Sequence, residues 1–314
     1  MRLGILDVGT SSIHLVIVEV GSANGFRIRL HQRALVRLGD DGLAQGRLTA
    51  PAMRRALAVL RRYAALLARY RVDRVEAVAT SAVRDAANGR TFVHQVRAQL
   101  GLPLRILSGV EEARLIYRGV LHAHPSTRPT LLVTIGGGSA QVMLGDPTGL
   151  RYAASVKLGA ARLAQRFLRR HPPRPGELQA LRRHLRRRWA PACRALRHHQ
   201  WDRALGCSAM IDQLMLAASL TRHPRATHDP DPRRLSLNQR SLRALIDRLL
   251  QATAAQRTRL PGLDPRRADL ALPAAEALLT WMEGCGVRVL RGTSGSLREG
   301  LVVAWLDRTR RRRG

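Results

Sequence analysis

The sequence contains almost no lysine and comparatively few acidic side chains. Its 314 residues include 54 basic and 22 acidic side chains, which gives a formal net charge of +32, and Lys157 is the only lysine. GC-rich coding accounts for a preference for arginine over lysine, but it does not account for the sign of the charge. A positive field of this size favours polyanionic partners such as polyphosphate, nucleic acid or anionic lipid.

Cysteine and long apolar runs are also scarce. The three cysteines lie far apart and form no CxxC pair, so neither a zinc site nor a disulfide framework is indicated, and a reducing compartment fits. The first twenty residues do not have the order of a signal peptide, because Asp7 and Glu19 interrupt them. No uncharged apolar stretch approaches the length of a membrane span. We therefore expect a cytoplasmic protein that does not contact a membrane.

The length and pattern of the chain predict two α/β domains. A chain of 314 residues can bury a large core and is long enough for two domains. Short apolar strands alternate with helical segments, which indicates partly parallel sheets. Pro125 and Pro129 lie in a segment without periodicity at residues 122–130, so we place the domains at 1–125 and 126–314.

The second half of the chain is rich in arginine. Residues 161–200 carry twelve arginines and one acid, Glu177, and helical periodicity persists over 177–196. This face is a candidate docking surface for a long polyanion, with an ordinary solvated helix face as the alternative. Further along the chain we expect a polar loop at 222–234, helices at 237–249, 268–282 and 296–306, a strand at 287–290 and a frayed tail at 308–313.

A glycine-rich turn separates two apolar runs at residues 130–145, TLLVTIGGGSAQVMLG. The turn is formed by Gly136, Gly137, Gly138 and Ser139, and the flanking runs predict a β-hairpin. Three consecutive glycines leave backbone N–H groups bare of side chains, which allows close approach to a phosphate. An ordinary tight hairpin is the alternative interpretation.

A similar turn occurs 127 residues earlier in the chain. Asp7 and Val8 precede Gly9, Thr10, Ser11 and Ser12, and apolar strands flank the turn on both sides. A repeat of this period indicates two similar domains, each of which presents a small-residue turn to a shared cleft.

Four charged side chains are candidates for chemistry. Glu111 and Glu112 begin a helix after a strand and a Ser-Gly turn. There they either cap the helix and offset its dipole, or one of them deprotonates a water that attacks phosphorus. Asp7 either holds Mg²⁺, directly or through water, or bonds to its own backbone. Arg84 lies at a strand-to-helix turn, where it would be a fixed phosphate ligand.

In order and spacing, these motifs resemble the exopolyphosphatase/guanosine pentaphosphate phosphohydrolase (Ppx/GppA) family in its short, two-domain form. The matching stretches are 6–15 (LDVGTSSIHL), 79–88 (ATSAVRDAAN), 108–117 (SGVEEARLIY), 135–139 (IGGGS), 158–163 (LGAARL) and 296–300 (SLREG).

The resemblance implies two actin-like (ribonuclease H-type) α/β domains around a central cleft. It also implies Mg²⁺-dependent release of terminal phosphate from polyphosphate or from the guanosine nucleotide pppGpp. By position, Glu112 matches the catalytic glutamate, Asp7 belongs to the first phosphate loop and Arg84 matches a phosphate ligand. In our hydrolase hypothesis Asp7 holds the Mg²⁺. The remaining phosphate-binding positions that it implies are Gly9, Thr10, Ser11, Ser12, Gly136, Gly137, Gly138 and Ser139.

Two positions depart from the family pattern. The second loop of the family typically reads Asp-Ile-Gly-Gly-Gly-Ser-x-Glu, whereas Thr134 and Gln141 occupy the two acid positions here. Threonine and glutamine can hydrogen-bond water or phosphate, but they bring no negative charge to Mg²⁺. We therefore keep two hypotheses: a hydrolase with a depleted acidic metal site, and a weak or inactive member that binds polyphosphate or an alarmone nucleotide as a sensor.

Other partners rank lower. Nucleic acid would bind only by non-specific electrostatics, since only Phe167 and Trp189 interrupt the arginines of residues 162–197 and no aromatic interleaving supports base stacking. The sequence leaves the oligomeric state open, with a homodimer as one alternative.

Overall fold

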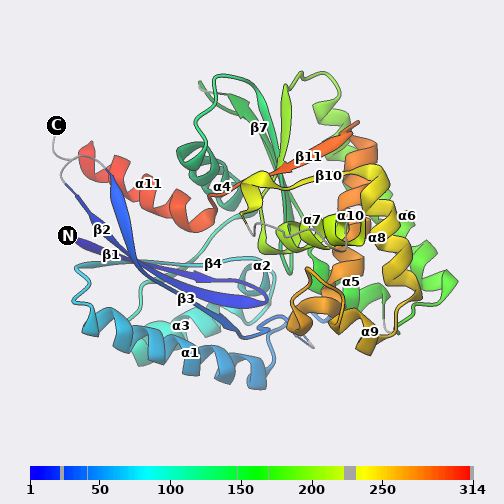
Figure 1. The fold of residues 1–314 in the computed structure, drawn as a ribbon. Helices are drawn as coiled ribbons and strands as arrows, with labels where there is room; N and C mark the ends of the chain where they lie inside the picture. The colour runs from blue at the N-terminus through cyan, green and yellow to red at the C-terminus, as the bar shows by residue number, and fades with distance from the viewer. Residues whose placement is uncertain (22–24, 41, 147, 169, 223–230, 312–314) are drawn as a thin grey trace. The chain divides into compact units, whose positions relative to one another are not determined.

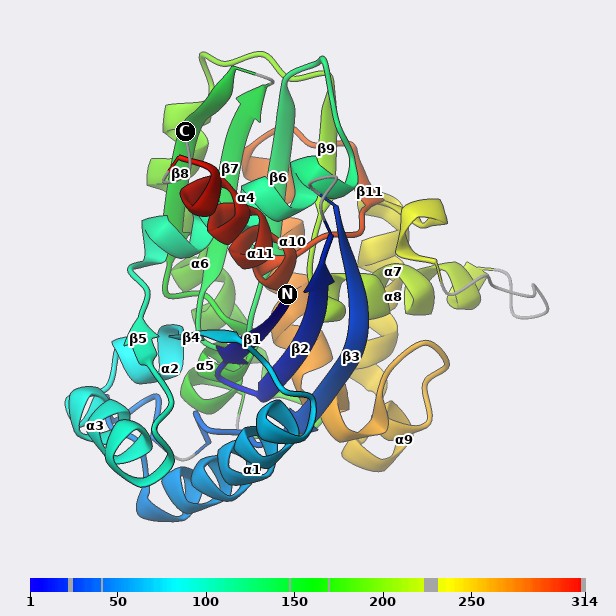
Figure 2. The same ribbon diagram turned by 90° about the vertical axis from the view of Figure 1, so that its left-hand side faces the viewer.

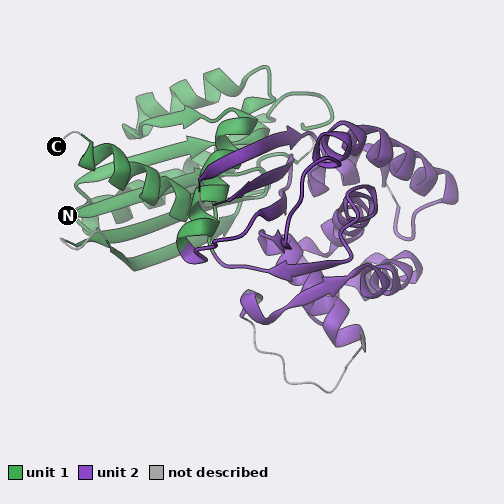
Figure 3. Cartoon of the chain, turned by 90° about the horizontal axis from the view of Figure 1, so that it is seen from above, with its two compact units in different colours: residues 1–122, 295–314 green, residues 123–294 purple. Residues whose placement is uncertain are grey.

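The computed structural model describes residues 1–21, 25–40, 42–146, 148–168, 170–222 and 231–311. The chain forms two compact units, residues 1–122 with 295–314 and residues 123–294 (Figure 3). Each unit is built on a mixed sheet with helices, which confirms the predicted α/β class. The division predicted from sequence assigns residues 295–314 to the second domain, whereas in the structure they belong to the first unit.

The first unit contains one mixed sheet and the helices that cover it. Its strands are β1 (Arg2–Val8), β2 (Ser12–Val20), β3 (Phe26–Leu35), β4 (Arg74–Ala79) and β5 (Leu104–Ile106), in the order β3-β2-β1-β4-β5. Its helices are α1 (Ala50–Arg69), α2 (Ser81–Arg84), α3 (Gly89–Leu100), α4 (Gly109–Ala123) and α11 (Leu297–Arg310). Strands β1, β2 and β3 are antiparallel neighbours, whereas β4 and β5 run parallel to β1. Figures 1 and 2 show α1 and α3 on one face of this sheet and α11 on the other.

Helix α11 returns to the first unit through a close crossing with α4. A Cβ on Gly300 would lie 1.8 Å from the carbonyl oxygen of Leu115, and a Cβ on Gly119 would lie 2.0 Å from that of Ser296. Only glycine allows the two backbones to approach this closely. The hydroxyl of Ser296 accepts a hydrogen bond from the backbone N–H of Arg298 and caps the helix.

The second unit contains the other mixed sheet. Its strands are β6 (Thr130–Ile135), β7 (Ala140–Asp146), β8 (Gly149–Val156), β9 (Arg203–Gly206), β10 (Ser236–Asn238) and β11 (Val289–Gly292), in the order β10-β11-β9-β6-β7-β8. Its α-helices are α5 (Ala160–Phe167), α6 (Pro175–Leu196), α7 (Ala209–Arg222), α8 (Gln239–Gln251), α9 (Ala254–Thr258) and α10 (Ala271–Gly284). Two short 3₁₀ helices are η1 (Pro232–Arg234) and η2 (Pro265–Leu270).

The two sheets repeat the same arrangement. Strands β6, β7 and β8 form an antiparallel meander, and β9 and β11 extend it by parallel pairing, as β4 and β5 do in the first unit. The order β8-β7-β6-β9-β11 therefore corresponds to β3-β2-β1-β4-β5. The internal repeat predicted from two glycine turns extends to whole sheets.

A layer of helices buries the core of the second unit. Helix α10 packs against α6 and α8, and nearly all of its side chains are buried. The indole N–H of Trp189 on α6 donates to the carbonyl oxygen of Ala277 on α10 at 3.0 Å. This bond fixes α6, so the arginines on the exposed side of α6 project from a rigid support.

Several predicted boundaries are wrong. Residues 236–238 form strand β10 rather than the start of a helix, because Asn238 caps α8 by accepting a hydrogen bond from Ser241. The strand predicted at 287–290 lies at Val289–Gly292. Residues 308–310 continue α11 instead of fraying, and Arg308 contacts Glu76 at 2.6 Å. The predicted loop at 222–234 lies largely outside the described residues.

No helix in the described part of the chain is long and apolar enough to cross a membrane.

Candidate active site

The first glycine turn is a hairpin that ends β1 and begins β2. The N–H of Gly9 donates to the carbonyl oxygen of Ser12 at 3.0 Å and closes the turn. The side chains of Thr10, Ser11 and Ser12 are buried. Asp7, which the sequence reading placed within the turn, belongs to β1 and lies opposite His14 of β2.

The second glycine turn has the same closing bond. The N–H of Gly136 donates to the carbonyl oxygen of Ser139 at 2.9 Å, between β6 and β7. Its carbonyl oxygens are tied to the start of α5: the N–H of Ala160 donates to Gly136 and the N–H of Ala161 to Gly137, both at 2.9 Å. A Cβ on Gly159 would lie 2.3 Å from the backbone of Gly138, so only glycine fits there.

Both turns contain backbone donors that the described chain does not use. Within the described residues, the N–H groups of Thr10, Ser11, Gly137 and Gly138 donate to no backbone or side-chain acceptor. Consecutive N–H groups of this kind form a concave anion site. The hydrogen bonds of the turns therefore support the predicted phosphate-binding role, which stays a prediction.

Glu112 and Arg84 form an ion pair in the first unit. Arg84 is the last residue of the short helix α2, which follows β4, and Glu112 lies in the first turn of α4, which follows β5. Because β4 and β5 are parallel neighbours, the two side chains lie at one edge of the sheet. The Nη1 of Arg84 donates to Oε2 of Glu112 at 2.8 Å and to the carbonyl oxygen of Leu107 at 3.1 Å. Arg84, the predicted phosphate ligand, therefore contacts Glu112, the predicted catalytic glutamate.

Burial sets the ionisation of Glu112. The side chain is 8% exposed, and desolvation raises its pKa from 4.5 to about 7, against the attraction of Arg84. The charges of Asp7 and Asp85 contribute in the same direction as burial. A carboxyl with a pKa near neutrality can accept a proton efficiently at physiological pH. The carboxylate of its neighbour Glu111 is exposed and pairs with Arg105, while the backbone N–H of Glu111 donates to the hydroxyl of Ser108, which caps the helix.

Asp7 is the second perturbed carboxyl of the first unit. Desolvation raises its pKa to about 6, the positive charge of Arg298 opposes this shift, and the negative charge of Glu299 adds to it. The Nε of Arg298 is buried without a hydrogen-bond partner among the described residues. The SLREG motif alone indicates no role for Arg298 or Glu299, because the packing of α11 against β1 is what places them near Asp7.

Thr134 and Gln141 face each other across the hairpin of the second unit. Both are buried, at 6% and 2% exposure. The amide nitrogen of Gln141 donates to the hydroxyls of Ser139 at 2.8 Å and Ser155 at 3.2 Å. The glutamine therefore supports the glycine turn instead of presenting charge.

These side chains do not fit a metal site built by the chain. Within the described residues, no group of three or more His, Cys, Asp or Glu side chains is arranged to hold a metal ion. Asp7 supplies one carboxylate, while Thr134 and Gln141 are neutral. The magnesium ligation predicted for Asp7 stays a prediction.

The comparisons with known proteins agree with this architecture. The shared strand order of the two units and the helices around them define an actin-like α/β protein. The chain belongs to the Ppx/GppA phosphatase family, whose model matches residues 16–309. The resemblance read from the sequence is therefore confirmed.

Relatives cover almost the whole chain. Exopolyphosphatase 2 of Mycobacterium tuberculosis is 31% identical over 320 residues, which span 96% of this chain and 98% of that protein. Exopolyphosphatase 1 of Mycobacterium bovis is 29% identical over 98% of this chain and 89% of its own length. The crystal structure of an exopolyphosphatase from Cytophaga hutchinsonii has a TM-score of 0.88 at 26% identity, with 98% of each chain covered. A family member from Aquifex aeolicus, at 24% identity and a TM-score of 0.79 over 98% of each chain, shares the fold.

Proposed function

We propose that the protein is an exopolyphosphatase-type hydrolase that releases terminal phosphate from inorganic polyphosphate. The observation that carries this proposal is Glu112: a buried glutamate with a pKa of about 7, paired with Arg84 at 2.8 Å. This combination is typical of a general base that acts at neutral pH. The similarity to mycobacterial exopolyphosphatases and the net charge of +32 support polyphosphate as the substrate.

The proposed reaction needs one proton acceptor and several phosphate-binding donors. Ionised Glu112 takes a proton from a water molecule as the water oxygen bonds to the terminal phosphorus. The bond between that phosphorus and its bridging oxygen breaks, and the shortened chain leaves with the bridging oxygen. Backbone N–H groups of a glycine turn that donate to no acceptor within the described residues bind non-bridging oxygens and stabilise the charge of the transition state. Arg84 positions the carboxylate and keeps part of its charge compensated.

A second candidate function is that of a sensor with little or no turnover. Thr134 and Gln141 favour it, because buried neutral side chains occupy both acid positions of the second loop. Phosphate binding would then survive through the glycine turns, with polyphosphate or a phosphorylated guanosine nucleotide as the ligand. The same nucleotide, as pppGpp, is the alternative substrate of the hydrolase.

Phosphate release and equilibrium binding, measured side by side, separate the two candidates. The hydrolase should release phosphate from polyphosphate, and Glu112→Ala should lower the rate about 10²–10⁴-fold with little loss of affinity. The matched control is Glu111→Ala, which changes the adjacent, exposed glutamate and should leave the rate unchanged. Tight binding without release would overturn the hydrolase, and robust release that depends on Glu112 would overturn the sensor. Replacing polyphosphate by pppGpp identifies the preferred substrate.

Three predictions from sequence stay predictions: the cytoplasmic location, a homodimer, and non-specific binding of nucleic acid.

A further inference from the structure

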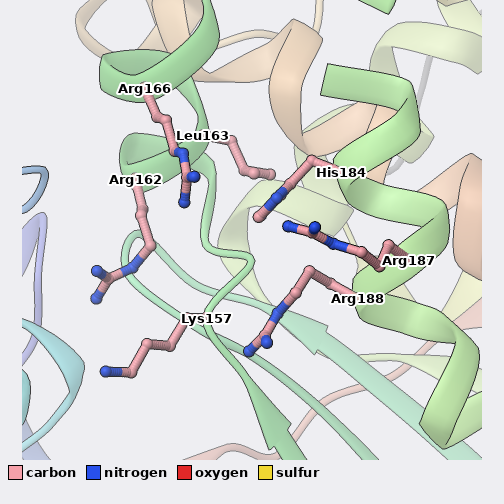
Figure 4. Close-up of a pocket in the computed structure, with 7 residues that line it drawn as sticks. All are labelled: Lys157, Arg162, Leu163, Arg166, His184, Arg187 and Arg188. Atoms are coloured by element: carbon pink, nitrogen blue, oxygen red, sulfur yellow. The ribbon is translucent and has the colours of Figure 1, made fainter. Parts of the chain in front are cut away.

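A strongly basic cavity of about 270 Å³ lies in the second unit between α5 and α6 (Figure 4). Its basic lining residues are Lys157, Arg162, Arg166, His184, Arg187 and Arg188. Among the described residues, no carboxylate lines the cavity, and Leu163 is the one apolar residue of the lining. Figure 4 shows Arg187 and His184 of α6 and Arg166 of α5 directed toward one another across the hollow. We call this hollow the α5–α6 basic pocket.

The side chains of the pocket repel one another. The pKa of His184 is lowered to about 4. Burial is the largest cause, and the positive charges of Arg166, Arg187 and Arg188 lower it further. The imidazole is therefore neutral at physiological pH and can still exchange hydrogen bonds with a ligand. Clustered guanidinium groups without a carboxylate among them are stabilised when an anion binds, and their fork geometry suits phosphate.

Arg162 joins this pocket to the glycine turn of the second unit. Its Nε donates to the carbonyl oxygen of Gly138 at 2.8 Å, and its backbone N–H donates to the carbonyl oxygen of Gly137 at 3.1 Å. Arg162 therefore lines the pocket and also contacts the turn in which the N–H groups of Gly137 and Gly138 donate to no acceptor within the described residues. A phosphate bound at the turn would lie close to the mouth of the pocket within one unit.

The chemistry of the lining distinguishes between phosphorylated ligands. A nucleotide needs an apolar or aromatic face for its base. None of the lining residues that the structure describes is Phe, Tyr or Trp, and the ring of His184 packs against Phe167 with the centroids 5.0 Å apart. A linear chain of phosphates presents charge along its length and no base, which matches a hollow lined by cations.

We propose that the α5–α6 basic pocket binds internal phosphates of a polyphosphate chain whose end lies at the glycine turn, and that it sets a preference for long chains. This proposal rests on the proposed function for the identity of the substrate. It adds a binding subsite that the reacting phosphate does not occupy.

The test compares two double variants of one helix. Arg187→Gln/Arg188→Gln removes two charges from the pocket, whereas Arg194→Gln/Arg197→Gln removes two exposed charges from the C-terminal end of α6 and its cap, outside the pocket. Dissociation constants are measured in the full chain for long-chain polyphosphate and for tripolyphosphate. We expect the pocket variant to lower the preference for the long chain at least about tenfold, since charge-assisted phosphate contacts contribute more than 1.4 kcal/mol. The control variant should retain that preference.

A further double variant and a second ligand separate this proposal from its alternatives. Arg187→Lys/Arg188→Lys keeps the charge and should restore most of the preference, with thermal melting used to verify that each variant is folded. An unchanged preference in the pocket variant, or an equal loss in the control, overturns the proposal. A larger loss of affinity for single-stranded DNA than for polyphosphate would make the pocket a nucleic-acid site and also overturn it.

Failure of the proposed function and failure of the proposed subsite give different combinations of phosphate release and equilibrium binding. If no variant releases phosphate but the loss of chain-length preference still appears in equilibrium binding, the subsite stands and the hydrolase does not. If phosphate release is robust and depends on Glu112, while the pocket variant and the control variant show the same preference for long-chain polyphosphate, the hydrolase stands and the subsite does not.

Discussion

Replacing Glu112 with glutamine should stabilise the protein at alkaline pH. Burial raises the pKa of this carboxyl from 4.5 to about 7. Below pH 4.5 it is protonated in both the folded and unfolded states, and the stabilising contribution of the raised pKa is fully present. As the pH rises through about 7, that contribution is lost, because the unfolded chain ionises freely and the folded chain must ionise a buried group. Glutamine resembles the neutral form at every pH, so the variant avoids this loss.

The expected effect is large for one substitution. A rise in pKa from 4.5 to about 7 corresponds to roughly 3 kcal/mol at pH values above both. Because Glu112 is 8% exposed, solvent screening removes little of this energy. At about 2–4 °C per kcal/mol for units of this size, the melting temperature of the variant should exceed that of the parent by roughly 6–12 °C at pH 8. At pH 4.5 the two should melt together.

Thermal melting at several pH values measures this difference. The control is Glu111→Gln, which alters the exposed neighbour paired with Arg105 and should shift the melting temperature little at any pH. A difference between Glu112→Gln and the parent that does not change with pH would refute the reasoning. So would a variant that melts below the parent at pH 8, because the carboxylate would then be stabilised by Arg84 rather than destabilised by burial.

Three other perturbations have defined outcomes. Thr134→Asp/Gln141→Glu should gain Mg²⁺-dependent phosphate release and a melting temperature raised by Mg²⁺, because facing carboxylates repel unless a cation neutralises them. Gly159→Ala should weaken phosphate binding by about tenfold in calorimetry, since its Cβ would displace the glycine turn 2.3 Å away. Cys193 and Cys285, whose Sγ atoms lie 3.0 Å apart, should form a disulfide on treatment with diamide, detected by thiol alkylation and mass spectrometry.

Each of these outcomes has a counterpart that would contradict it. If Mg²⁺ neither accelerates nor stabilises the doubly acidic variant, loss of metal-binding charge is not what distinguishes this chain from the family pattern. Gly176→Ala, where an added Cβ meets nothing within 4 Å, should leave phosphate affinity unchanged. An equal loss in both glycine variants would show that the Gly159 contact is unimportant. Cys207→Ser should not affect cross-linking, and cross-linking that requires Cys207 would contradict the assigned pair.

The parts of the fold that depend on local sequence were predictable. The glycine turn at 136–139 and its earlier copy are hairpins, because apolar strands on either side and small residues between them determine the local chain path. Their repetition predicted two similar units. The start of α8 was missed because Asn238 serves both as the last residue of a short edge strand and as a helix cap.

The features of the fold and of the site that depend on contacts between residues distant in sequence were not predictable. Residues 295–314 belong to the first unit because Gly119 and Gly300 allow two backbones to touch, and no local pattern links glycines so far apart in sequence. The sequence identified Glu112, but its pKa depends on burial produced by the whole unit. The arginine-rich segment predicted a basic face, whereas the connection through Arg162 to the glycine turn required the structure.

The return of α11 to the first unit has a consequence for synthesis of the protein. Residues 123–294 are complete as a unit before α11 leaves the ribosome, so the second unit can fold first, in contrast to the usual N-terminal-first order. The first unit must wait for residues 295–310 to cover its sheet and to bring Arg298 near Asp7. The charge environment of Asp7 is therefore completed only after residues 295–310 have been synthesised, and a nascent chain that stops before them lacks it.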